Sequence, residues 1–316
     1  MKTDKDVIII GGGAAGMAAA QYSSREGLKA LLVEEMSLGG QALLIEGIEN
    51  YPGCPEAVSG FELAERFETQ ARKFGAEFLY ATVKSLVKKD NVFTVETTKG
   101  TLTSLAVILA AGAKHRHLGV PGEEKLAGRG VSYCASCDGP FFKNQKIIVV
   151  GGGDSACDEA MFLSKLSSKI VLIHRRDRFR AQKALADRVL ANKNIEVRLS
   201  TALEEIRGKA NDKGIEKVSS VILKNTLTGE TYEEETAAVF IFAGSLPSNQ
   251  LVPDVPKDSG GCILTDEKME TATGGLFCAG DLRSKPFRQL VIAAAEGALA
   301  AHSAAEYIDG ISAPVR

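Results

Sequence analysis

One local pattern occurs twice in this chain, about 140 residues apart, and it constrains the fold more than any other feature. Residues 7–10 form a short β-branched run that leads into Gly11-x-Gly13-x-x-Gly16, and residues 146–150 lead into Gly151-x-Gly153-x-x-Ala156. Each turn precedes a helical stretch and a second apolar strand, at residues 30–33 and 170–173. Strand, glycine turn and helix in this order place helix N–H groups against a pyrophosphate. We therefore predict an α/β fold with two dinucleotide-binding, Rossmann-like domains.

The two repeats differ at the end of the second strand, where a nucleotide ribose is read. The first repeat ends in Glu34, and a carboxylate there accepts hydrogen bonds from ribose hydroxyls. The second repeat ends in His174, which is followed by a basic run containing Arg175, Arg176, Arg178 and Arg180. Guanidinium groups suit the 2′-phosphate of NADP, although a solvated basic helix end would look similar. The contrast favours FAD in the first domain and NADPH in the second. The run 276–281 and the Ala-rich helical pattern from Gln289 to Ala305 support the pairing.

A second repeated sequence pattern indicates where the boundary between the domains lies. Residues 106–112 and 238–244 are both apolar strands that end at a glycine, and each precedes a loop containing a proline. We interpret them as two crossings between domains, since 316 residues suit two domains. The first, discontinuous domain would comprise residues 1–117 and 246–316. The second, residues 118–245, would be inserted into it and would bind NADPH.

Composition excludes several classes of protein. The 38 basic and 40 acidic residues leave a net charge of −2, so we expect no nucleic-acid partner. No apolar run approaches the ~18 residues of a spanning helix, so we expect no membrane association. The N-terminal apolar run is interrupted by glycines, and Asp4 and Asp6 stand where a signal peptide is basic. A cytoplasmic location is the resulting expectation.

The chemistry lies in the segment CASCDG, residues 134–139. Cys134 and Cys137 are the one closely spaced pair among six cysteines, and in a reducing compartment such a pair is redox-active or metal-binding more often than structural. Zinc would need further ligands such as His115 and His117, whose spacing is not that of a usual zinc finger, so we predict no metal. Asp138 follows the pair directly and indicates proton handling during dithiol chemistry.

Taken together, the motifs resemble those of low-molecular-weight thioredoxin reductases. They are GGGAAG (11–16), GGQ (39–41), ENYPG (49–53), GRGVSYCASCDG (128–139), GGGDSA (151–156), HRRDRFRAQK (174–183), CAGDLR (278–283) and RQ (288–289). They span nearly the whole chain in the order that the family keeps. The resemblance implies a homodimeric flavoenzyme that passes electrons from NADPH through FAD to the Cys134/Cys137 pair, and on to the disulfide of thioredoxin.

The resemblance also assigns roles to individual positions. The FAD-contacting positions would be Gly11, Gly13, Gly16, Glu34, Gly40, Gln41, Asn50, Asp281, Arg288 and Gln289. The NADPH-contacting positions would be Gly153, Asp154, Ser155, His174, Arg175, Arg176 and Arg180. Cys137 would receive electrons from the flavin, Cys134 would attack the disulfide of thioredoxin, and Asp138 would be the acid and base. The inserted domain would rotate on its two crossings, so that dithiol and NADPH reach the flavin in turn.

The chain departs from the family pattern in a few places. Cys54, Cys157, Cys262 and Cys278 stand where the family more often has other small or apolar residues, and we expect them to be buried, inert core fillers. Ser136 replaces a common Thr. The alternatives are a flavin-dependent NADPH reductase of another small disulfide protein, an NADPH oxidase, and a non-enzymatic zinc- or nucleotide-binding regulator.

Overall fold

The computed structural model describes residues 3–45, 47–210, 214 and 216–312. The chain forms two compact units, one made of Met1–Lys114 and Leu246–Arg316 and the other of His115–Ser245. Each unit contains a sheet with a block of parallel strands and with helices on one face. The fold is therefore α/β with two Rossmann-like units, the second inserted into the first, which confirms the predicted fold class.

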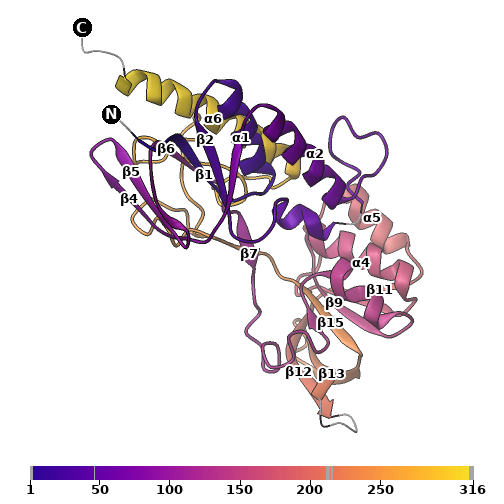
Figure 1. The fold of residues 1–316 in the computed structure, drawn as a ribbon. Helices are drawn as coiled ribbons and strands as arrows, with labels where there is room; N and C mark the ends of the chain where they lie inside the picture. Colours follow the sequence, from indigo (N-terminus) through magenta and orange to yellow (C-terminus); the bar gives the residue numbers. More distant parts are fainter. Residues whose placement is uncertain (1–2, 46, 211–213, 215, 313–316) are drawn as a thin grey trace. The chain divides into compact units, whose positions relative to one another are not determined.

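The first unit is built on a mixed sheet (Figure 1). In spatial order its strands are β3 (Glu77–Tyr80), β2 (Ala30–Glu34), β1 (Lys5–Ile10), β6 (Gly100–Leu109), β5 (Val92–Thr97) and β4 (Val83–Lys89), and β17 (Leu276–Cys278) also pairs with β6. The strands β3, β2, β1, β6 and β17 are parallel, whereas β4 and β5 form an antiparallel hairpin. β6 is long enough to pair with β5 through its first half and with β17 through its second half. The carboxyl ends of β1, β2 and β17 therefore share one edge of the sheet.

Alternation along the strands separates two cores in this unit. Ile9 and Ile108 face a cluster formed with the helices, whereas Ile8 and Val107 face the β4–β5 hairpin and residues 251–263. The helical elements of the unit are α1 (Ala14–Arg25), η1 (Gly40–Leu44), α2 (Gly60–Lys73) and α6 (Leu290–Ser312). Figure 1 shows α1, α2 and α6 along the same side of the sheet. Each fully buried Ile contributes about 1.5–3 kcal/mol to folding, so the continuous apolar strands fix this layering.

The second unit repeats the layering with a different cover on its far face. In spatial order its parallel strands are β11 (Ile195–Arg198), β10 (Ile170–Ile173), β9 (Ile147–Gly151), β15 (Ala238–Phe242) and β8 (Val131–Ser132). The helical elements are α3 (Ala135–Asp138), η2 (Gly139–Phe142), α4 (Asp154–Leu166) and α5 (Lys183–Ala191). They cover the sheet face that carries Val149 and Leu172. The opposite face, with Ile148 and Val171, packs on an antiparallel sheet of β12 (Thr201–Ala210), β13 (Glu216–Asn225) and β14 (Thr231–Glu235).

Two short strands occur where the chain crosses between the units. β7 (Ala113–His115) and β16 (Ser245–Pro247) pair with each other. The backbone N–H of Arg116 donates to the Gly244 carbonyl at 2.9 Å, and that of Ser248 donates to the Gly112 carbonyl at 3.0 Å. The two crossings thus form one narrow hydrogen-bonded ribbon. Among the described helices, including the long α6, none has the length and apolar run that crossing a bilayer demands.

Candidate functional site

The cysteine pair lies on a single helical turn that follows β8. Cys134 and Cys137 are joined by a disulfide, with their Cα atoms 5.4 Å apart. The backbone N–H of Cys137 donates to Cys134 Sγ at 3.1 Å, and that of Cys134 donates to Ser132 Oγ at 3.1 Å. Within this chain Cys137 is exposed and Cys134 is half-buried. The i, i+3 spacing of a helical turn therefore closes the ring and leaves one sulfur open to solvent.

Packing beneath the turn holds the disulfide in place. Ala135 is fully buried in the helix-side core of the second unit. A Cβ added at Gly139 would lie 2.8 Å from Leu163 Cδ2, so η2 rests directly on α4. Asp138, which lies between Ala135 and Gly139 in the chain, donates its backbone N–H to the Cys134 carbonyl at 3.2 Å. The turn that carries the disulfide and the first part of α4 therefore pack on the same apolar core.

A polar cluster next to the disulfide was not anticipated from the sequence. Tyr133 Oη donates to Glu123 Oε1 at 2.7 Å and lies 2.8 Å from His117 Nδ1. Glu123 is only 2% exposed and also accepts the backbone N–H groups of Leu118 and Gly119, at 3.0 and 2.7 Å. Burial, and then the hydrogen bond to Glu123, raises the pKa of Tyr133, so the phenol stays protonated. The cluster anchors the residue that precedes the reactive pair.

The two histidines considered as zinc ligands have other neighbours. The His115 ring stacks on Tyr133 at 5.9 Å between centroids, and the His117 ring contacts it edge-on at 5.0 Å. Burial, and then the nearby His117, lowers the pKa of His115. Within the described residues no group of three His, Cys, Asp or Glu side chains is arranged to hold a metal ion.

The positions matched to NADPH gather around the turn between β9 and α4. Gly153, Asp154 and Ser155 begin α4, and His174 follows β10. A Cβ added at Gly152 would lie 2.4 Å from the His174 ring, so this ring packs flat against the turn. The backbone N–H of Arg180 donates to the Gly152 carbonyl at 2.6 Å. The structure therefore brings the basic segment 174–180 onto the glycine turn.

Several polar groups around this turn have no partner within the described structure and are available to bind an anion. His174 is 9% exposed, and its buried Nε2 has no hydrogen-bond partner in the described structure. Burial, and then repulsion from Arg176, Arg175 and Arg180, lowers its pKa, so the ring is neutral at pH 7. The three arginines are exposed, and no ion pair between their guanidinium groups and a described carboxylate is present. A nucleotide phosphate fits this donor set.

Asp154 has a specific internal partner. Its Oδ1 accepts the backbone N–H of Gln182 at 2.7 Å, and its Oδ2 accepts Gln182 Nε2 at 2.9 Å. Both carboxylate oxygens are thus engaged by the segment that also carries Arg180. Asp154 therefore joins that segment to the start of α4. It lies between the glycine turn and the arginines.

The positions matched to FAD begin at the turn between β1 and α1. Gly11 has φ +106°, and a Cβ at Gly16 would lie 1.8 Å from the Gly11 carbonyl oxygen, so both positions require glycine. Gly13 caps α1 with open space at its Cβ position and with no side-chain cap. The first turn of α1 has no acidic residue. Its N–H groups and positive dipole end are therefore suited to a pyrophosphate.

Further matched positions in the first unit come together around this turn. Glu34 accepts the backbone N–H groups of Gly12 at 2.7 Å and Met36 at 2.9 Å, which orients its carboxylate beside the turn. A Cβ at Gly40 would lie 3.2 Å from Gly13 Cα. The remaining side-chain contacts are Gln41 Nε2 to the Ala113 carbonyl at 2.5 Å, Asn50 Nδ2 to Gln289 Oε1 at 3.0 Å, and Arg288 Nη2 to Cys262 Sγ at 3.1 Å. Asp281 follows β17, and the adjoining Gly280 lies against Ala15 of α1.

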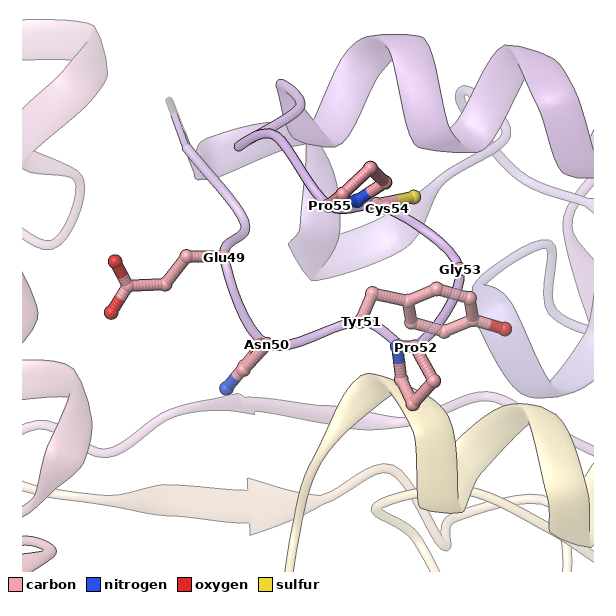
Figure 2. Close-up of a pocket in the computed structure, with 7 residues that line it drawn as sticks. All are labelled: Glu49, Asn50, Tyr51, Pro52, Gly53, Cys54 and Pro55. Carbon is pink, nitrogen blue, oxygen red and sulfur yellow. The ribbon is translucent and has the colours of Figure 1, made fainter.

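Figure 2 shows the loop that carries Asn50, and residues 49–55 of this loop line an open pocket. Cys54 in this loop is half-buried rather than buried, so the expectation of a core filler is wrong there. The loop contains two prolines and a glycine. Cys54 packs against the edge of a small core cluster, and its Sγ lies 3.7 Å from Arg66 Nη1. The other three unpaired cysteines are buried, as expected. Burial raises the pKa of Cys157 to about 12 and also raises that of Cys278.

A thiol titration of the native, oxidised protein will separate these cysteines. About one thiol per chain will react with an aromatic disulfide reagent within minutes, because a buried, protonated thiol is a poor nucleophile. Replacing Cys54 by Ser will remove that fast phase, and unfolding in denaturant will expose the remaining thiols. A fast phase that persists in the Cys54→Ser protein would contradict the burial of Cys157, Cys262 and Cys278.

Comparisons with known proteins agree with the geometry. A family model described as pyridine nucleotide-disulphide oxidoreductase matches residues 5–298. A thioredoxin reductase of Treponema pallidum is 53% identical over 309 residues, which cover 98% of this chain and 99% of that protein. One from Bacillus subtilis is 42% identical over 305 residues, covering 96% and 95%. A crystal structure of Lactococcus lactis thioredoxin reductase has a TM-score of 0.92 at 40% identity, covering 97% of this chain and 100% of that one.

Proposed function

From the premise that this chain belongs to the pyridine nucleotide-disulphide oxidoreductase family, and within it to the thioredoxin reductases, we infer that it is a thioredoxin-disulfide reductase. Its cofactors are NADPH and FAD, and its protein substrate is thioredoxin. The observation that carries the inference is the Cys134–Cys137 disulfide on a surface turn, packed on the same core as the glycine turn of α4. Bound FAD supplies the two-electron carrier between NADPH and this disulfide.

The cysteine pair performs the exchange in a balanced sequence. The disulfide takes up two electrons and two protons and becomes two thiols. Cys134, as a thiolate, then attacks the disulfide of thioredoxin, and Cys137 resolves the mixed disulfide, so two thiols are left on thioredoxin and the Cys134–Cys137 bond re-forms. The N–H of Cys137 supports this division of roles, because it donates to Cys134 Sγ and so stabilises negative charge there. Asp138, directly after the pair, is the proposed proton donor and acceptor.

The cofactor sites follow from the two glycine turns. The discontinuous domain, residues 1–117 and 246–316, would bind FAD through the α1 turn, Glu34 and the other matched positions of the first unit. The inserted domain, residues 118–245, would bind NADPH through Gly153, Ser155 and the basic segment, and His174 Nε2 is a donor or acceptor free for that ligand. Since dithiol and NADPH site share one domain, the paired crossings β7 and β16 would act as a hinge that presents them to the flavin in turn.

Assembly and location belong to the same proposal. The resemblance to the family supports a homodimer, which the molar mass of the native protein in solution will test. Four cysteines are unpaired in addition to the redox-active pair, which supports a cytoplasmic location, where thiols stay reduced.

The decisive experiment is reconstitution of the whole electron path. The purified protein will carry FAD, NADPH will bleach the flavin anaerobically, and NADPH consumption will then depend on added oxidised thioredoxin. A panel of other small disulfide proteins serves as the comparison. Flavin reduction without thioredoxin turnover, but with turnover of another member of the panel, would reassign the substrate.

The Asp154–Gln182 contact leads to a prediction about nucleotide preference. Asp154→Ala will raise the KM for NADPH several-fold and the KM for NADH less, because the segment that carries Arg180 loses two hydrogen bonds to the start of α4. The kcat will change little. Steady-state kinetics with both nucleotides measures the effect, and Lys183→Ala, which removes an exposed neighbour of Gln182, is the control. Equal changes in both KM values would instead indicate a general role in nucleotide binding.

A further inference from the structure

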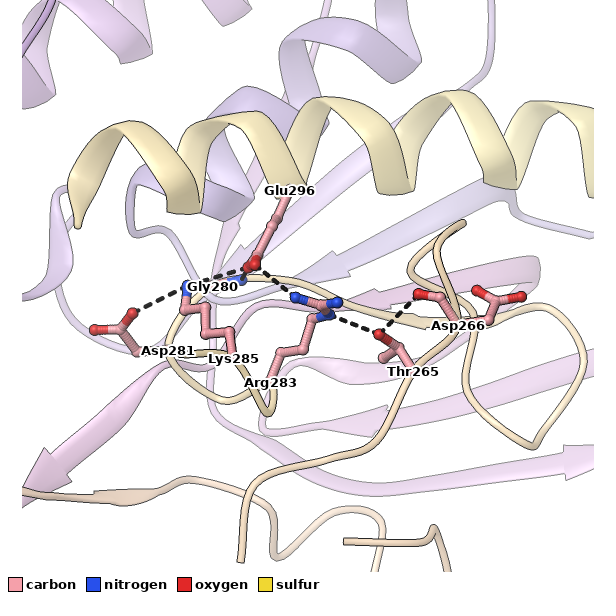
Figure 3. Close-up of polar contacts among 7 residues, drawn as sticks. All are labelled: Thr265, Asp266, Gly280, Asp281, Arg283, Lys285 and Glu296. Atoms are coloured by element: carbon pink, nitrogen blue, oxygen red, sulfur yellow. Dashed lines mark hydrogen bonds and ion pairs between the residues drawn. The ribbon is translucent and has the colours of Figure 1, made fainter. Parts of the chain in front are cut away.

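A buried lysine stands beside the FAD-matched residue Asp281 (Figure 3). The Lys285 side chain is only 2% exposed, although it carries an ammonium group. Its Nζ lies 3.1 Å from Glu296 Oε2 and 3.2 Å from Asp281 Oδ1. A buried charge is costly unless it is paired, and the two carboxylates provide that pairing for the Lys285 ammonium group.

Glu296 is the fixed end of this network. It lies on α6, is 7% exposed and accepts the backbone N–H of Gly280 at 2.9 Å. Its other oxygen accepts Arg283 Nη1 at 2.8 Å, and Arg283 Nε donates to Thr265 Oγ1 at 2.6 Å. Every one of these contacts joins the turn after β17 to a neighbouring segment. Glu296 is therefore fixed by contacts at both of its oxygens, and it restricts the position of the Lys285 ammonium group.

Asp281 is the exposed end of the network. Its side chain is 34% exposed, whereas that of Glu296 is buried, and its Oδ1 pairs with Lys285. Figure 3 shows the second carboxylate oxygen of Asp281 directed away from Lys285 and Glu296. An ionised carboxylate held at one oxygen keeps the other oxygen, and the remaining lone pairs, for an outside donor.

We propose that Lys285, braced by Glu296, is a positioning residue that holds the Asp281 carboxylate in the orientation in which it accepts hydrogen bonds from hydroxyl groups of FAD. This inference rests on the proposed function, since it takes FAD as the ligand of the first unit. Lys285 itself makes no contact with FAD in this scheme; it acts through Asp281. Loss of Lys285 therefore lowers FAD affinity only while Asp281 is present.

The experiment measures FAD release from the purified holoenzyme on dilution, followed by the rise in free-flavin fluorescence. The variants are Lys285→Met, Asp281→Asn and the double variant, and Lys285→Arg tests rescue by a second cation. Lys257→Met is the matched control, because the Lys257 ammonium donates to three backbone carbonyls of the same unit and does not touch the network. Thermal unfolding of each protein is recorded in parallel.

Lys285→Met will raise the dissociation constant of FAD about tenfold, which corresponds to about 1.4 kcal/mol, and Lys285→Arg will restore most of the affinity. Lys257→Met will leave FAD affinity within about twofold of the native value even if its melting temperature falls. Asp281→Asn and the double variant will release FAD equally, because the two changes remove the same interaction.

Three results would overturn the inference. The first is a Lys285→Met protein that retains FAD as the native protein does, and the second is an Asp281→Asn protein whose FAD release is unchanged. The third is a double variant whose loss is the product of the two single losses. A failure of the proposed function looks different, because in that case the native protein carries no FAD.

Discussion

Replacement of Cys134 by Ser will leave the flavin fully reducible by NADPH and will abolish thioredoxin reduction. The variant keeps the glycine turns and the basic segment that bind the cofactors, but it lacks the proposed attacking thiolate. A serine hydroxyl at the same place stays protonated at neutral pH and does not attack a disulfide. Anaerobic flavin bleaching measures the first step, and NADPH oxidation with oxidised thioredoxin measures the whole path.

The control for this experiment is Cys54→Ser, which removes the half-buried unpaired thiol and should turn over thioredoxin as the native protein does. A Cys134→Ser protein that is folded but cannot be bleached by NADPH would show that the pair has a different place in the electron path. Turnover of thioredoxin by that variant would show that Cys134 is not the attacking thiol.

Replacement of both Arg175 and Arg176 by Ala will lower kcat/KM for NADPH at least about 100-fold and leave kcat/KM for NADH nearly unchanged. Each charge-assisted hydrogen bond to a phosphate contributes about 1.5–3 kcal/mol, and NADH lacks that phosphate. Both guanidinium groups are exposed beside the glycine turn. Steady-state kinetics with the two nucleotides at fixed thioredoxin gives the ratio directly.

Arg178→Ala is the matched control for the double variant. Arg178 is exposed in the same basic segment but does not match a nucleotide-contacting position of the family, so its loss should change the ratio by less than about threefold. An unchanged NADPH-to-NADH preference in the double variant would exclude these arginines as the 2′-phosphate site. An equal loss in the control would point to the general positive field of the segment.

The secondary structure around both nucleotide turns could be predicted from the sequence because its signals are local. The strand predicted at residues 170–173 has those bounds in the structure, and β1 extends the predicted run 7–10 by two residues toward the N-terminus. The helix predicted from Gln289 begins at Leu290 and continues to Ser312, beyond the predicted end at Ala305. Short β-branched runs bounded by glycines, and long Ala-rich stretches without proline, specify their own backbone conformation.

Several polar partnerships could not be predicted, because their members are far apart in the sequence. Glu296 meets Lys285 only because α6 packs beside the turn after β17. Gln182 meets Asp154 only because the segment after β10 folds back onto the α4 turn. A charge or amide in the sequence carries no sign of such a partner. The position of Tyr133 directly before the reactive pair was the one signal for the polar cluster in the sequence. Nothing in the sequence indicated that its partner Glu123 is buried.

The sequence by itself determined the two glycine turns, the strands and helices on either side of them, the identity of the cysteine pair and the family resemblance, because each is written in contiguous residues. Only the tertiary structure decided which carboxylates have both oxygens bonded within the protein and which keep an oxygen available to a ligand. Asp154 and Asp281 illustrate the difference: both follow glycines at the end of a strand, yet one has both oxygens engaged by Gln182 and the other is held at one oxygen by Lys285. The physical reason is that burial and hydrogen-bond partners depend on which segments the sheets bring together, and local sequence does not encode that.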